Sequence, residues 1–110
     1  MIQLNEGAFN ALWVDDLRDV PEDTEELRWT CARTAWEALV KLELIEFDIV
    51  SLDHDIASFL GYKEITGYDI AVWLADRKES GNYVPPDVRI HSANPVGVQN
   101  IQSVIDRYLS

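Results

Sequence analysis

The chain has 110 residues, the size of one compact domain, and 47% of them are apolar, enough for a hydrophobic core. Its net charge of −11, from 20 acidic and 9 basic residues, excludes broad DNA binding unless metal ions bridge the like charges. The sequence shows no membrane-length apolar run and no signal-peptide pattern, and its single cysteine, Cys31, excludes an internal disulfide. We therefore expect a single cytoplasmic domain over residues 1–110 without a membrane partner.

The first half of the chain predicts two strands and a helix. Residues 8–14, AFNALWV, form an apolar stretch that reads as a buried strand. An acidic loop broken by proline follows, and residues 27–32 then alternate apolar and polar side chains as a second strand does. Thr34 and Glu37 have the spacing of a capping box and open a helix that runs to about Ile45.

The second half of the chain predicts two further strands and two helices. Residues 47–52 are the third strand, and residues 56–65 are expected to be a long loop. A helix over residues 67–80 and a strand over residues 88–93 come next. The dipeptide Asn94-Pro95, a side-chain cap followed by a residue suited to the first helical position, starts the last helix. Strands that alternate with helices in this way predict an α/β domain with a mainly parallel sheet.

Polar side chains collect where the predicted strands end. The carboxyl ends of parallel strands lie at one edge of a sheet, and ligands bind there. Four carboxylates, both histidines of the chain, a hydroxyl and an amide are expected at this edge: Asp15, Asp16, Asp53, His54, Asp55, His91, Ser92 and Asn94. Taken one at a time, these residues are also explained by turns and helix caps, Asn94 above all, so their convergence is the argument for a site.

The chemistry of these residues favours a metal-assisted reaction on phosphate. Several carboxylates at close range repel one another, and a hard divalent cation such as Mg²⁺ or Mn²⁺ removes that conflict. Such an ion also binds phosphate oxygens, which would let a strongly acidic chain hold a phosphorylated substrate. Histidine titrates near neutral pH, so His54 and His91 are candidates for proton transfer.

The strand ends resemble those of the receiver domain of two-component signalling. Receivers carry an acidic pair after the first strand, here Asp15-Asp16, a phosphoacceptor after the third, here Asp53, and a Ser-Ala or Thr-Ala pair after the fourth, here Ser92-Ala93. The chain departs from this pattern in its two histidines, in the acidic loop that replaces the first helix, and in the absence of a fifth strand with its lysine.

The segments LWVDDLRDVP, SLDHD, TGYDIAVWLADR and IHSANPVG resemble more closely a divergent receiver-like family proposed to process cyclic phosphates, with phage and bacterial members. This resemblance implies a receiver-like (flavodoxin-like) fold. We expect four strands in the order 2-1-3-4, helices on both faces of the sheet, and no fifth strand.

The expected function is that of a metal-dependent phosphoesterase or cyclic phosphodiesterase acting on cyclic phosphates of RNA ends or nucleotides. Its metal ligands would be Asp15, Asp16, Asp53 and Asp55, its acid and base His54 and His91, and its phosphate ligands Ser92 and Asn94. Two alternatives stay open, namely a non-catalytic pseudo-receiver that binds a partner and an acidic inhibitor that mimics nucleic acid.

Overall fold

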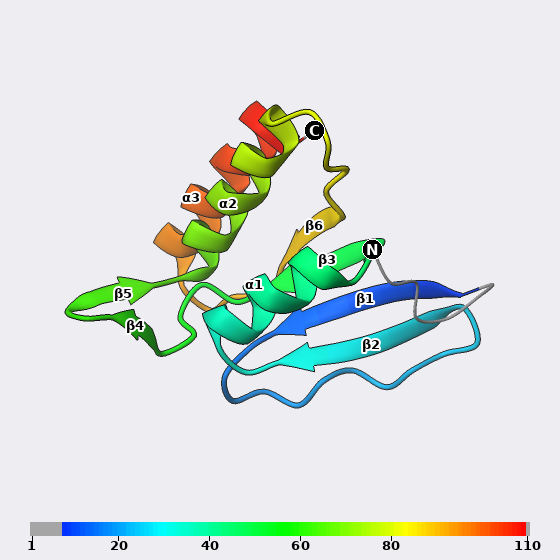
Figure 1. Cartoon of the computed structure of the whole chain (residues 1–110). Helices are drawn as coiled ribbons and strands as arrows, with labels where there is room; N and C mark the ends of the chain where they lie inside the picture. The colour runs from blue at the N-terminus through cyan, green and yellow to red at the C-terminus, as the bar shows by residue number, and fades with distance from the viewer. Residues whose placement is uncertain (1–7, 110) are drawn as a thin grey trace.

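The computed structural model describes residues 8–109 (Figure 1). The predicted lack of a leader and the extent of the domain over residues 1–110 involve residues 1–7 and 110, which lie outside the described part. In the described part, no helix is long and apolar enough to cross a bilayer. The elements in chain order are β1 (Phe9–Val14), β2 (Leu27–Ala32), α1 (Ala35–Leu44), β3 (Ile49–Leu52), β4 (Ser58–Leu60), β5 (Lys63–Ile65), α2 (Gly67–Glu79), β6 (Asp87–Ile90), α3 (Pro95–Val104) and a final turn of π-helix, η1 (Ile105–Leu109).

The main sheet has four strands in the order β2-β1-β3-β6, and every pairing in it is parallel. This confirms the α/β class and the predicted order 2-1-3-4. The register places Val14 opposite Ala32 and Leu52, and Leu52 opposite Ile90. All four strands therefore end at the same level of one edge, which is where the polar residues were expected.

The hydrophobic core lies on one face of this sheet. Leu12, Val14, Val50 and Leu52 point to that face and are fully buried with apolar side chains of the three helices. Trp13 points to the opposite face, is half-buried, and lies outside the core cluster. Figure 1 shows α1, α2 and α3 on the same side of the sheet.

The prediction of helices on both faces is therefore wrong. After β2 each crossover moves across the sheet in the same direction, first to β3 and then to β6. Right-handed crossovers that run in one direction place their helices on one face. The only connection that runs the other way joins β1 to β2, and in this structure it is the acidic loop, which contains no helix.

The segment predicted as a loop over residues 56–65 contains a second, two-stranded sheet. β4 and β5 pair in antiparallel fashion, with Phe59 opposite Glu64, and Gly61 adopts a φ of +62° in the turn between them. This hairpin extends away from the body of the domain (Figure 1). Strands of three residues are too short to show a two-residue period, so the pattern gave no signal for them.

Two strand boundaries also differ from the prediction. β3 begins at Ile49 instead of Phe47, although Phe47 is buried and contributes to the core. β6 ends at Ile90, so His91 follows the strand instead of lying within it.

Candidate functional site

The backbone ladder extends one residue beyond the strands and positions the first residue of each loop. The N–H of Asp15 donates to the carbonyl of Ala32, that of Asp53 to Val14, and that of His91 to Leu52, at 3.0 to 3.1 Å. Asp15, Asp53 and His91 are thereby held in register at the carboxyl edge of the sheet. The backbone at these three residues is therefore held by the same inter-strand hydrogen bonds as the strands.

Three of the four predicted metal ligands come together at this edge. Asp15, Asp16 and Asp53 each offer a carboxylate oxygen, and these oxygens all lie within 4.8 Å of one another. Asp15 is 1% exposed and Asp53 is 8% exposed, so neither charge is freely solvated. Carboxylates in such an arrangement suit a hard cation such as Mg²⁺ or Mn²⁺, and the residues present fit that class of ion.

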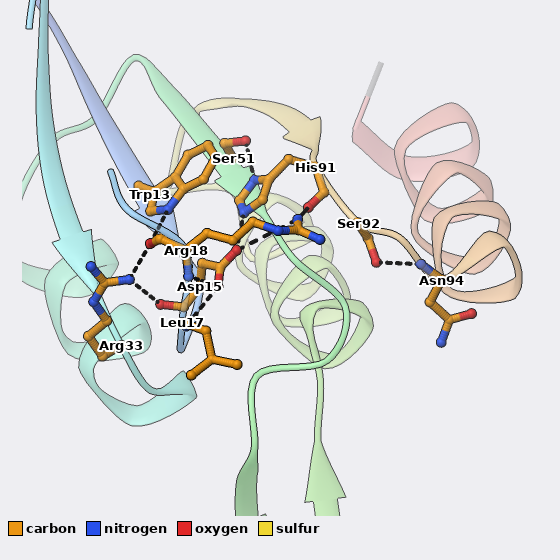
Figure 2. Close-up of polar contacts among 9 residues, drawn as sticks. All are labelled: Trp13, Asp15, Leu17, Arg18, Arg33, Ser51, His91, Ser92 and Asn94. Carbon is orange, nitrogen blue, oxygen red and sulfur yellow. Dashed lines mark hydrogen bonds and ion pairs between the residues drawn. The ribbon is translucent and has the colours of Figure 1, made fainter. Parts of the chain in front are cut away.

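Asp15 is the most tightly held member of this cluster (Figure 2). Its Oδ1 accepts hydrogen bonds from the backbone N–H groups of Leu17 and Arg18, both at 2.9 Å, and its Oδ2 lies 3.1 Å from Nε2 of His91. Burial by itself raises the pKa of Asp15, but the N–H groups of Arg18 and Leu17 and the ring of His91 outweigh it, so that the pKa is lowered. Asp15 is therefore an anion at neutral pH.

Both ring nitrogens of His91 are engaged. Its Nδ1 lies 2.6 Å from Oγ of Ser51, its Nε2 bonds to Asp15, and the ring stacks on Trp13 at a centroid distance of 3.6 Å (Figure 2). Burial lowers the pKa of His91, against the opposing effect of Asp15. A neutral ring satisfies both bonds when Nε2–H donates to Asp15 and Nδ1 accepts from the Ser51 hydroxyl.

A second group forms at the start of α3. Nδ1 of His54 lies 2.8 Å from Oδ1 of Asp55, and Nδ2 of Asn94 donates to Oδ2 of Asp55 at 3.3 Å. The hydrogen bond with His54, helped by the one from Asn94, lowers the pKa of Asp55. Asp55 therefore bridges His54 and the helix start, whereas the other three aspartates face one another.

Two glycines at helix starts allow His54 and Asp53 to pack closely against the helices. A Cβ on Gly97, in the first turn of α3, would overlap the ring of His54, and a Cβ on Gly67, at the start of α2, would overlap the carbonyl of Asp53. His54 thus packs on the first turn of α3. Asp53 packs on the first turn of α2.

Ser92 and Asn94 lie at this edge as predicted, but they make local contacts. The hydroxyl oxygen of Ser92 accepts from the N–H of Asn94 at 3.1 Å (Figure 2), and Oδ1 of Asn94 accepts from the N–H of Gly97 at 3.1 Å. The capping role predicted for Asn94 is confirmed. Their role as phosphate ligands stays a prediction.

The site also contains two arginines and one serine that were not predicted from the sequence. Arg18 Nη1 donates to the carbonyl of His91 at 2.8 Å and lies 3.8 Å from Oδ2 of Asp15. Arg33 donates to the carbonyls of Asp15 and Arg18 (Figure 2). The position of Arg18 within the acidic stretch that follows the first strand could have indicated that it pairs with a carboxylate of the site. Nothing in the apolar segment around Ser51 indicated its partner, which is 40 residues away.

A cavity of about 460 Å³ opens over the acidic cluster. It is lined by Asp15, Asp16, Leu17, Arg18, Asp53, Asp55, Ala57, Phe59, Glu64 and Ala93. Four aspartates from the strand ends and one arginine therefore line this cavity, and Phe59 and Glu64 line it from the β4–β5 hairpin.

A family model described as the cyclic-phosphate processing receiver domain matches residues 10–107 of the chain. This match covers both the strand ends and the helix starts that build the site. Neither a search of curated proteins nor a search of solved structures gives a significant match. The chain belongs to the family of cyclic-phosphate processing receiver domains.

Proposed function

We propose that this domain carries out metal-dependent processing of phosphoesters, with cyclic phosphates of RNA ends or nucleotides as substrates. The observation that carries the proposal is the meeting of three carboxylate oxygens within 4.8 Å in the lining of a cavity that Arg18 also lines. Membership of a cyclic-phosphate processing family supports the choice of substrate.

In this proposal Asp15, Asp16 and Asp53 hold Mg²⁺ or Mn²⁺, with Asp55 beside them. A bound ion would neutralise the carboxylates and supply positive charge to phosphate oxygens. Arg18, which lines the same cavity, adds a positive charge. Ser92 and Asn94 would contact the phosphate at the N-terminus of α3, where backbone N–H groups favour anions.

His54 and His91 are our candidates for the general acid and base, and their contacts place different demands on them. The Nδ1 of His54 is taken by Asp55, so Nε2 is the nitrogen that would exchange a proton with substrate. His91 would first have to release Asp15 or Ser51. These contacts suit His91 better to holding Asp15 in place, and they make His54 the stronger candidate for proton transfer.

The test is turnover of a panel of 2′,3′-cyclic nucleotides and cyclic-phosphate-ended RNA with Mg²⁺ or Mn²⁺ present. We expect His54→Ala to lower turnover by about 10²- to 10⁴-fold, the usual contribution of a general acid or base. Asp53→Asn should lose most of the turnover that Mg²⁺ or Mn²⁺ stimulates, because it removes one proposed ligand of the ion. His91→Gln, which cannot titrate, serves as the comparison, and circular dichroism checks that each variant folds. If the His54→Ala variant and the Asp53→Asn variant each turned over substrate at the wild-type rate, the proposal would be refuted.

A non-catalytic receiver-like module is the second candidate, because Asp53 and the acidic pair are placed as in a receiver. Over residues 8–109 the main sheet ends at β6, so no fifth strand brings in the lysine that receivers use to bind the phosphoryl group. We therefore expect acetyl phosphate to leave no lasting adduct on Asp53. Stoichiometric phosphorylation of Asp53, detected by intact-mass spectrometry, would favour this second candidate over the enzyme.

A further inference from the structure

The β4–β5 hairpin brings an aromatic ring to the acidic cavity. Phe59 is 57% exposed and lines the same cavity as Asp15, Asp16 and Asp53. Its neighbour in β4, Ser58, is buried and faces the body of the domain, where its Oγ accepts from the N–H of Ala35 at 2.9 Å. Because side chains alternate along a strand, this anchor directs Phe59 to the cavity side of the hairpin.

A carboxylate stands next to this ring. Glu64 is the residue directly opposite Phe59 in the hairpin register, and it lines the same cavity. Directly opposed residues of an antiparallel pair share a face and lie within contact distance. An exposed aromatic face beside a hydrogen-bond acceptor is the combination with which proteins hold a flat, polar ring.

The backbone before the hairpin is also unusual. Ala57 adopts a φ of 46°, in the left-handed region that non-glycine residues rarely occupy, and it lines the cavity as well. Strained backbone of this kind clusters at active sites and ligand clamps. Here the segment that follows carries Phe59.

We propose that the hairpin forms a nucleobase subsite for the substrate. The base stacks on Phe59, and Glu64 accepts hydrogen bonds from N–H groups on its edge, while the phosphate of the same molecule lies at the acidic cluster. This inference rests on the proposed function and narrows its substrate class to phosphates that carry a base. Guanine presents two adjacent N–H donors on one edge and uracil one, so guanine suits a carboxylate better.

The experiment measures binding by isothermal titration calorimetry, with Mg²⁺ present, for guanosine 2′,3′-cyclic phosphate and for the base-free glycerol 1,2-cyclic phosphate. Phe59→Ala should weaken binding of the guanosine probe by about 5- to 150-fold, the range for one stacked base, and leave the glycerol probe unchanged. Phe59→Trp should retain the affinity. Glu64→Gln should reduce the preference for the guanosine probe over its uridine counterpart.

Leu60→Ala is the matched control, since Leu60 is 60% exposed on the same strand but does not line this cavity. It should bind both probes as wild type does. Equal loss of both probes in Phe59→Ala, or no loss of either, would overturn the base subsite while leaving phosphate processing intact. If wild type neither bound nor turned over either probe, the proposed function would fall and the subsite with it.

Discussion

At the scale of single residues, Asp15 and His91 form the best-ordered part of the site. Asp15 accepts hydrogen bonds at both oxygens, and His91 is held by Ser51, Asp15 and the face of Trp13. Buried polar groups are generally satisfied in this way, because an unpaired one is costly. The site is therefore preorganised before a ligand binds.

The lowered pKa values of these two residues predict how stability depends on pH. Since burial lowers the pKa of His91 below its ordinary value of 6.5, the folded state favours the neutral ring. As the pH falls through 6.5, the unfolded chain takes up this proton first, so the free energy of unfolding decreases. The stability contributed by Asp15 is present above its ordinary pKa of 3.8 and is lost in stronger acid, as the pH falls through its lower folded value.

Urea denaturation between about pH 5 and pH 8, with a chelator present, measures the His91 effect. Wild type should lose stability toward the acidic end, and His91→Gln should lose less because the titrating ring is gone. Parallel curves for the two proteins would show that His91 does not titrate differently in the folded and unfolded states.

At the scale of elements, the β4–β5 hairpin is attached to the domain mainly through buried contacts at its base. Ser58 accepts from the N–H of Ala35 and donates to the carbonyl of Ile56, so one hydroxyl joins the hairpin to the first residue of α1. Ile65, which lies opposite Ser58 at the base of the hairpin, belongs to the hydrophobic core. The tip carries exposed side chains, including Tyr62.

Replacing this anchor should cost stability. Ser58→Ala leaves the buried N–H of Ala35 unpaired, and we expect a loss of about 1–3 kcal/mol in the free energy of unfolding. Hydrogen exchange in the hairpin should increase in the same variant. Ser103→Ala is the control, because its exposed hydroxyl bonds only within α3, and it should change stability by less than about 0.5 kcal/mol. Equal effects of the two substitutions would contradict the anchoring role.

At the scale of the whole molecule, the net charge of −11 makes any bound cation stabilising, so a specific site must be separated from a general effect of charge. A ligand that binds only the folded state stabilises it by about 2.7 kcal/mol at 100 times its dissociation constant. We expect millimolar Mg²⁺ or Mn²⁺ to raise the melting temperature by several degrees.

Asp53→Asn should remove most of this rise, because it deletes one carboxylate of the cluster. It should also melt no lower than wild type without metal, since it relieves repulsion between buried charges. Asp87→Asn changes the net charge equally but lies at the start of β6, at the opposite edge of the sheet, and should keep the full metal response. A metal response unchanged in Asp53→Asn would rule out the cluster as the binding site.

Much of the fold could be predicted because its determinants are local. Thr34 accepts from the N–H of Glu37, and Asn94 caps α3, as the spacing of these residues indicated. The apolar strands lead into acidic or polar residues, and a parallel sheet brings those ends to one edge. The sequence by itself thus determined the α/β class and the meeting of Asp15, Asp16 and Asp53, whereas the strand order followed from the resemblance to receiver-like domains.

Only the tertiary structure decided which groups touch. His91 is 76 residues from Asp15 and 40 residues from Ser51 in the sequence. Arg18, whose side chain donates to the carbonyl of His91, is 73 residues from it. No pattern within a few residues encodes such pairs, because they depend on the register of neighbouring strands. The placement of α1, α2 and α3 on one face was also decided by the tertiary structure, because it follows from the direction of the crossovers. Phe59 reaches the cavity because the β4–β5 hairpin is anchored to the domain, and the strands of this hairpin are too short to be predicted from their sequence.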